Sequence, residues 1–164
     1  MPLASPRSLF FLGFLVCVAL MGAGFYLQYE VGLEPCPLCM VQRVFFVAFG
    51  LVCLLAALHG PARGGRRAYA VLALLLAAAG AATAGRQVWL QNMPVDQLPA
   101  CMPGLEYMLE SGQPLLQIIG TVLHGSADCA EVNWTFLSMS VPEWSLLAFA
   151  GMLVLGLFQL LRRD

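Results

Sequence analysis

Two cysteines separated by two residues are the side chains of this sequence best suited to chemistry. Cys36 and Cys39 belong to the stretch Cys36-Pro37-Leu38-Cys39-Met40-Val41-Gln42-Arg43, which stands between two long apolar runs. A thiol at the start of a helix, or near an arginine, is stabilised as the reactive thiolate. Cys39 and Arg43 are four residues apart, so they share one face of a predicted helix. The pattern predicts a redox centre at a membrane surface.

Two further cysteines, Cys101 and Cys129, lie in a later polar segment and form a second natural pair. A structural bridge between them would stabilise the fold by about 3–4 kcal/mol through loop closure. The small Cys-x-x-Cys ring gains little as a staple, so redox exchange is favoured over purely structural bridges. A zinc site is the third alternative, but it prefers a second such pair or nearby histidines.

The composition identifies a membrane protein. The chain has 164 residues, of which 60% are hydrophobic and only 10% charged, whereas soluble domains carry about 25% charged residues. The length fits a single domain covering residues 1–164. The formal net charge of −1 and the absence of lysine give no indication of nucleic-acid binding.

Four apolar runs are close to the roughly 20 residues that cross a bilayer. A cleaved signal peptide is the rival interpretation of the first run, but that run is longer than the apolar region of a signal peptide, about 7–15 residues. We therefore expect an all-α membrane protein, a four-helix transmembrane bundle. The expected spans are about 9–28, 40–58, 68–90 and 144–161, the expected outer loops are about 29–39 and 91–143, and Arg63-Gly64-Gly65-Arg66-Arg67 is expected as a basic turn. Gly80 and Ala84 would allow close helix packing.

The charges predict the orientation of these spans. In a four-span arrangement six arginines fall on one side, and the loops on the other side carry acidic residues but no arginine. The positive-inside rule then places both termini in the cytoplasm and the four loop cysteines outside. Three tryptophans would form an aromatic belt at the outer interface. The arginines are Arg7, Arg63, Arg66, Arg67, Arg162 and Arg163, and the tryptophans are Trp89, Trp134 and Trp144.

The long outer loop contains apolar residues at helical spacing between Leu115 and Leu123. This spacing predicts a short amphipathic helix on the membrane surface, with packing against the top of the bundle as an equal alternative. Cys17 and Cys53 fall in mid-span, where thiols behave as small hydrophobic side chains.

A redox relay at this place needs an electron acceptor. The sequence has no haem-attachment, dinucleotide-binding or iron–sulfur motif. A quinone dissolved in the membrane fits the location, and a guanidinium at Arg43 could stabilise charge on a reduced quinone oxygen or on the Cys39 thiolate. The alternative for Arg43, and equally for Arg86, is a side chain that extends to the outer headgroups.

The order of these features resembles the family of disulfide bond formation protein B (DsbB). The features are four spans, Cys-x-x-Cys-x-x-x-Arg between the first two, and a Cys101…Cys129 loop before the fourth. The phrase Asp128-Cys129-Ala130-Glu131, with Trp134 and Pro142-x-Trp144, is also similar to the family's loop. The resemblance covers nearly the whole chain. It implies a multi-pass protein of the bacterial inner membrane and a dithiol:quinone oxidoreductase that uses no metal.

The resemblance also implies a role for each cysteine. A reduced periplasmic oxidase of the DsbA type would attack the Cys101–Cys129 bridge and form a mixed disulfide with Cys101. Cys129 would exchange with Cys36 and free Cys39, which would pass electrons to ubiquinone or menaquinone with the help of Arg43. Gln42 and Gln87 are further candidates for quinone contact, Gln87 standing where the family can carry a histidine.

Two other functions compete with this one. A protein resembling vitamin K epoxide reductase would also have four spans and a quinone, but its loop cysteines precede the Cys-x-x-Cys, whereas here they follow it. A membrane scaffold with a merely stapled loop is the non-enzymatic alternative.

Overall fold

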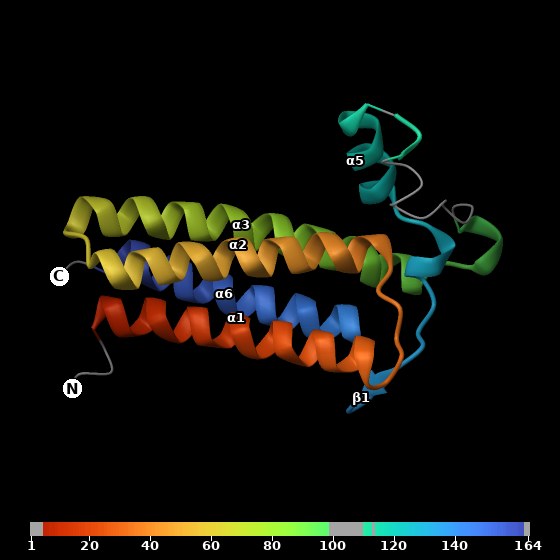
Figure 1. Cartoon of the computed structure of the whole chain (residues 1–164), viewed down its shortest axis with the longest axis horizontal. Coiled ribbons are helices and arrows are strands. Elements are labelled where there is room, and N and C mark those ends of the chain that lie inside the picture. The colour runs from red at the N-terminus through yellow and green to blue at the C-terminus, as the bar shows by residue number, and fades with distance from the viewer. Residues whose placement is uncertain (1–4, 99–109, 113, 163–164) are drawn as a thin grey trace.

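Four long helices form the body of the protein. The computed structural model describes residues 5–98, 110–112 and 114–162. The long helices have 21 to 29 residues each and are apolar enough to cross a membrane, as predicted. Figure 1 shows them side by side, with the α2–α3 turn and the described ends of the chain together at one end of the bundle. The helices are α1 (Pro6–Tyr29), α2 (Pro37–His59), α3 (Arg63–Gln91) and α6 (Val141–Leu161).

The opposite end of the bundle carries the short elements, which we call the loop end (Figure 1). All of them lie between α3 and α6 in the chain. The two strands form an antiparallel hairpin in which Thr135 pairs with Ser140. The short elements are η2 (Val95–Gln97), α5 (Leu115–His124), η3 (Ala127–Cys129), β1 (Thr135–Phe136) and β2 (Met139–Ser140).

The helix boundaries follow from ordinary capping chemistry. Ser5 caps α1, because its hydroxyl accepts the Ser8 N–H over 3.2 Å. The Glu143 carboxylate accepts the Ser140 N–H at the start of α6. Gly60 ends α2 with a φ of 56°, a left-handed conformation that suits glycine.

The third span begins earlier than the sequence predicts. The expected basic turn over residues 63–67 is wrong, because α3 starts at Arg63 and the turn is confined to residues 60–62. The reason lies in the side chain of Arg66, which is buried and donates to the backbone carbonyl of Arg162 over 2.8 Å. That carbonyl is at the end of α6, where the helix leaves acceptors unpaired, so it gives the buried guanidinium an acceptor inside the bundle.

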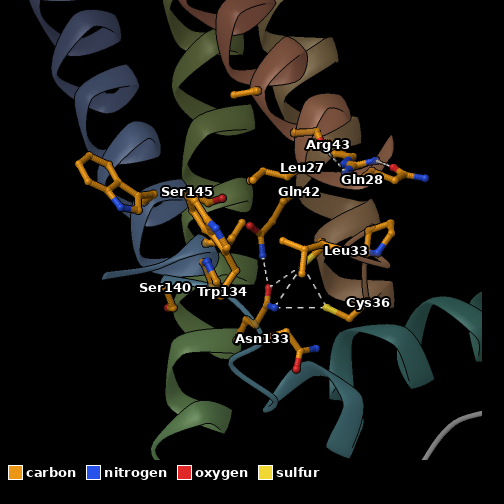
Figure 2. A pocket seen from close by; sticks show the side chains of 18 of the residues that line it. Leu27, Gln28, Leu33, Cys36, Gln42, Arg43, Asn133, Trp134, Ser140 and Ser145 are labelled. Atoms are coloured by element: carbon orange, nitrogen blue, oxygen red, sulfur yellow. Dashed lines mark hydrogen bonds between the residues drawn. The ribbon is translucent and has the colours of Figure 1, made fainter. Parts of the chain in front are cut away.

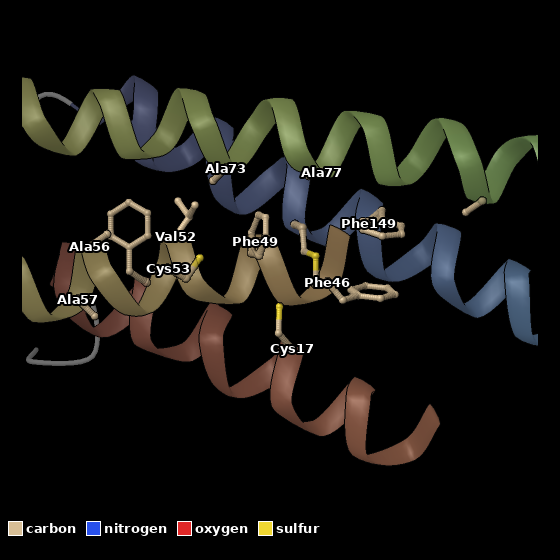
Figure 3. Packing of buried hydrophobic residues seen from close by; sticks show 13 residues of the cluster. Cys17, Phe46, Phe49, Val52, Cys53, Ala56, Ala57, Ala73, Ala77 and Phe149 are labelled. Atoms are coloured by element: carbon tan, nitrogen blue, oxygen red, sulfur yellow. The ribbon is translucent and has the colours of Figure 1, made fainter. Parts of the chain in front are cut away.

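The core of the bundle is built from aromatic rings and small side chains. The rings of Phe46 and Phe149 stack with their centroids 4.2 Å apart, and Figure 3 shows them beside Ala77 of α3. Gly80 faces the Phe149 ring, because a Cβ built on it would overlap that ring. Close packing at Gly80 is thereby confirmed. Cys17 and Cys53 are both buried in this apolar cluster, as the sequence indicates.

The short helix α5 is present where the periodicity predicts it. In Figure 1 it runs across the direction of the bundle, beside the loop end. Ile118 and Val122 are buried and pack against Val41 of α2. Leu116 and Ile119, on the same helix, are exposed. One face of α5 therefore contacts the top of the bundle, and contact of the other face with a membrane stays a prediction.

Candidate functional site

Cys36 and Cys39 meet at the start of α2. Cys36 is the N-cap residue and Cys39 is the third residue of the helix. Their sulfurs are 3.1 Å apart, a contact between two thiols rather than a disulfide bond, which measures about 2.05 Å. The free N–H groups of the first helical turn make this a favourable place for a thiolate.

Cys129 comes from the distant loop and packs against the same pair. It ends η3, is fully buried, and shares a small apolar cluster with Leu38 and Leu90, against which Cys36 packs. Gly125 allows this approach: its φ is 81°, and a Cβ there would overlap the side chain of Leu90. The loop backbone thus lies directly on α3, which brings a third sulfur to the Cys-x-x-Cys pair.

The contact between Cys36 and Cys129 shifts the pKa values of the two thiols in opposite directions. The Cys36 thiol donates a hydrogen bond to Cys129, which lowers the pKa of Cys129 to about 6 in spite of burial. Hydrogen bonds from Ser126 lower it further. The same contact with Cys129, followed by the contact with Cys39 and by burial, raises the pKa of Cys36. In the reduced protein Cys129 is therefore the better nucleophile and Cys36 the better proton donor.

Two buried glutamines lie under the sulfurs. The Gln87 amide N–H groups donate to Cys36 Sγ and to Cys39 Sγ, each over 3.2 Å. Gln42 in turn donates to the Gln87 amide oxygen over 2.7 Å. The sequence singled out both glutamines as quinone contacts, and the structure brings both to the cysteine pair. The N–H groups of the Gln87 amide are directed at the two sulfurs.

Arg43 lies one turn further along α2 than Cys39, as the spacing predicts, and its guanidinium reaches toward α1. It donates to the Gly24 carbonyl over 3.0 Å and to the side-chain oxygen of Gln28. It also lies 5.2 Å from the centre of the Phe25 ring. These contacts give the guanidinium partners on α1, and its extension to the outer headgroups stays an untested alternative.

A cavity of about 360 Å³ adjoins these groups at the loop end. Its walls are mostly apolar and come from α1, α2 and the start of α6, and the rings of Trp134, Phe136 and Trp144 lie on the loop side. Cys39 and Arg43 line the same cavity, and Figure 2 shows Gln42, Arg43 and Cys36 around it. Apolar walls with a few polar groups suit an apolar ring that carries hydrogen-bond acceptors. A quinone headgroup has that chemistry, so the residues present fit it.

Other site residues were not found from the sequence. Gln28 and Ser126 were not singled out. Gln28 could have been found, because a polar residue near the end of one span is a candidate partner for an arginine in a neighbouring span. Nothing in the pattern around Ser126 indicates its contact with Cys129. Cys101 lies outside the described residues, and so does the expected Cys101–Cys129 pairing.

Comparison with known proteins gives one consistent family. The family model described as "Disulfide bond formation protein DsbB" matches residues 6–159. A relative from Stutzerimonas stutzeri named disulfide bond formation protein B is 60% identical over 164 residues, covering 100% of each chain. Disulfide bond formation protein B 1 of Pseudomonas aeruginosa is 59% identical over 163 residues, covering 99% of each chain. A relative from Marinobacter nauticus is 52% identical over 157 residues, covering 96% of this chain and 93% of its own.

Proposed function

The chain belongs to the DsbB family of disulfide bond formation proteins, and on that basis we propose that it reoxidises a DsbA-like dithiol oxidase and passes the electrons to a membrane quinone. The observation that carries the proposal is the meeting of three sulfurs, Cys36, Cys39 and Cys129, beside a mostly apolar cavity. A loop cysteine buried against a Cys-x-x-Cys pair has the position needed for disulfide exchange. A stapled scaffold gives no reason for such a contact.

The first exchange takes place between proteins. A thiolate of the reduced partner attacks the Cys101–Cys129 bridge at Cys101, and the bridging electron pair leaves with Cys129 as a thiolate. Hydrogen bonds from Ser126 lower the pKa of Cys129 and so favour its departure as a thiolate. The second partner thiol then attacks the mixed disulfide, so that the partner leaves as a disulfide and Cys101 is released as a thiolate.

The second exchange takes place within the chain. The Cys129 thiolate attacks Cys36 Sγ of a Cys36–Cys39 disulfide. A Cys36–Cys129 bond forms, the Cys36–Cys39 bond breaks, and the electron pair of the broken bond stays on Cys39. The packing of Cys129 against Cys36 rather than against Cys39 supports this direction of attack. Cys39 lines the cavity, so the electrons arrive at its wall.

A bound quinone, ubiquinone or menaquinone, would supply a two-electron acceptor at this wall. Arg43 and the apolar side chains around it would hold the ring. Hydrogen bonds to Gly24 and Gln28 already hold the guanidinium in position, so the charge does not have to be moved when a ligand binds. The aromatic side chains on the loop side would keep water from the ring.

The proposal includes an orientation in the bacterial inner membrane. The described arginines of the positive-inside pattern, among them Arg7 and Arg66, belong to the end of the bundle that carries the chain termini. The acidic loop end would face the periplasm, where a DsbA-like partner is found, and the lipid bilayer would surround the four helices.

The decisive experiment is anaerobic turnover of the purified protein with a reduced DsbA-type oxidase and ubiquinone or menaquinone. We expect quinone reduction in the unmodified protein and none with Cys39→Ser. Trapping of free thiols with and without quinone distinguishes the enzyme from the scaffold alternative, because purely structural disulfides stay oxidised in both conditions. Undiminished turnover in Cys39→Ser would refute the role of that sulfur.

A further inference from the structure

The amide of Gln87 occupies the position from which a charge on either sulfur of the pair would be stabilised. Its N–H groups lie 3.2 Å from Cys36 Sγ and 3.2 Å from Cys39 Sγ. Gln87 is buried, with an exposed fraction of 3%. A hydrogen bond to a charged acceptor in such a place is roughly twice as strong as one between neutral groups, because little water competes for it.

Gln42 fixes which end of that amide faces the sulfurs. Its own side-chain N–H donates to the Gln87 oxygen over 2.7 Å, and Gln42 is only 2% exposed. With its oxygen engaged by Gln42, Gln87 presents its N–H groups to the cysteines. Figure 2 shows this chain of hydrogen bonds running from Gln42 toward Cys36.

The guanidinium of Arg43 is committed elsewhere. Its described hydrogen bonds go to Gln28 and to the Gly24 carbonyl, both on α1. Gln87, by contrast, contacts Cys39 directly. A neutral donor also suits a site whose resting state is an uncharged disulfide, since no unpaired cation has to be buried there while the bond is intact.

We propose that Gln87 is the residue that stabilises the thiolate released on Cys39, and that Gln42 is a positioning residue that orients the Gln87 amide. The inference rests on the proposed function. When Cys129 attacks Cys36, the Cys36–Cys39 bond breaks, a new Cys36–Cys129 bond forms, and the electron pair of the broken bond remains on Cys39 Sγ. The two Gln87 N–H groups then have one anionic acceptor within hydrogen-bond distance. No proton is transferred, so the amide serves at every pH at which the protein is folded.

The test measures the chemical reactivity of Cys39 and needs neither a quinone nor a partner protein. The full-length protein is reduced, reacted with iodoacetamide at neutral pH, and the rate of labelling at Cys39 is followed by peptide mass spectrometry. We expect Gln87→Leu to slow this labelling about tenfold, because a hydrogen bond to a charged group is lost. Gln42→Leu should slow it less, since the donor remains but is free to rotate.

Gln91→Leu is the matched control. Gln91 is one helical turn away on α3 and lines the same cavity, but its side-chain oxygen accepts from Ser140 and not from a thiol. Labelling of Cys39 should be unchanged in this variant. Equal slowing by Gln91→Leu, or rates within twofold of the unmodified protein in Gln87→Leu, would overturn the proposal.

A second variant guards against misfolding. Gln87→Glu has the same shape and replaces the donor with an acidic group, so it should slow labelling of Cys39 at least as much as Gln87→Leu. If only this variant folds, its labelling rate decides the matter, and an unchanged rate refutes the role of Gln87. Failure of the proposed function would show differently, as absent quinone reduction by the unmodified protein.

Discussion

The guanidinium of Arg86 donates to the backbone carbonyl of His124 over 2.9 Å and lies 4.3 Å from the centre of the Trp89 ring. The bond joins the third span to the last turn of α5, a few residues before Cys129. It satisfies a carbonyl at a helix end and holds the segment that carries the buried sulfur. Arg86 is therefore a tether between the bundle and the loop.

Removing this tether should weaken the docking of Cys129. We expect Arg86→Ala to slow turnover with a reduced DsbA-type oxidase about threefold to tenfold, as the loss of one charge-assisted hydrogen bond implies. Reduction of the Cys36–Cys39 pair by a small dithiol should change little, because that reaction does not use the loop. Stopped-flow measurement of both reactions checks this. Arg67→Ala, which removes an exposed arginine at the far end of the same helix, is the control and should leave both reactions unchanged. If Arg86→Ala slowed turnover with the oxidase and reduction by the small dithiol equally, the role of Arg86 as a tether would be contradicted.

The ionisation of Cys129 should depend on Cys36. Because its pKa is lowered to about 6, Cys129 is a thiolate above that pH and a thiol below it. In the fully reduced protein, the thiolate fraction of Cys129 should rise with pH through about 6 and then level off. In reduced Cys36→Ala the donor is absent, so we expect the pKa of Cys129 to return toward the ordinary value of about 8.5. The ultraviolet absorbance of the thiolate measures this pKa, and the Cys129→Ser variant identifies which part of the signal comes from Cys129. An identical titration of Cys129 in the unmodified protein and in Cys36→Ala would rule out the hydrogen bond as the cause.

The packing of α3 against α6 makes a prediction about stability. Gly80→Ala places a methyl group on the Phe149 ring and should destabilise the protein by about 1–3 kcal/mol. Gly85→Ala, five residues further along the same helix, meets open space and should leave stability unchanged or raise it by up to about 1 kcal/mol. Thermal unfolding in detergent distinguishes the two. A lower Tm for Gly85→Ala than for Gly80→Ala would show that the helix packing is misassigned.

Arg43 should matter for binding of the acceptor. We expect Arg43→Ala to raise the apparent KM for ubiquinone about tenfold or more, since a charged donor at the cavity wall is lost. Arg43→Lys keeps the charge but lacks the two-pronged guanidinium that reaches both Gly24 and Gln28. Its KM for ubiquinone should therefore lie between that of the unmodified protein and that of Arg43→Ala. Steady-state kinetics with varied quinone measure this. An unchanged KM in Arg43→Ala would mean that the side chain serves only to join α1 and α2.

The sequence predicted the bundle well because apolar length alone determines a span. The four runs, the helix at residues 115–124 and the close contact at Gly80 all rest on patterns of neighbouring residues. The start of α3 was missed, because arginines and glycines in a row indicate a turn unless a partner for the charge is known. That partner, the carbonyl of Arg162, lies almost a hundred residues away.

The contents of the site were predictable only in part. The spacing of Cys36, Cys39 and Arg43 places them on one face of a helix without any tertiary information. The contact of Cys129 with Cys36 came only from the family resemblance, since no local pattern encodes it. The orientation of the Gln87 amide depends on Gln42, a residue of another helix, and such side-chain networks follow from packing rather than from spacing.

Cys36 stands just before the first residue of α2 and Cys39 inside its first turn. Cys36 therefore belongs to the segment that leads into the helix and Cys39 to the helix itself, and both line the cavity between the spans. In the proposed reaction a protein donates electrons from the aqueous side, and a lipid-soluble molecule accepts them on the membrane side. The protein partner can stay in water and the quinone can stay in the membrane, because the two cysteines at the first turn of α2 pass the electrons from one to the other.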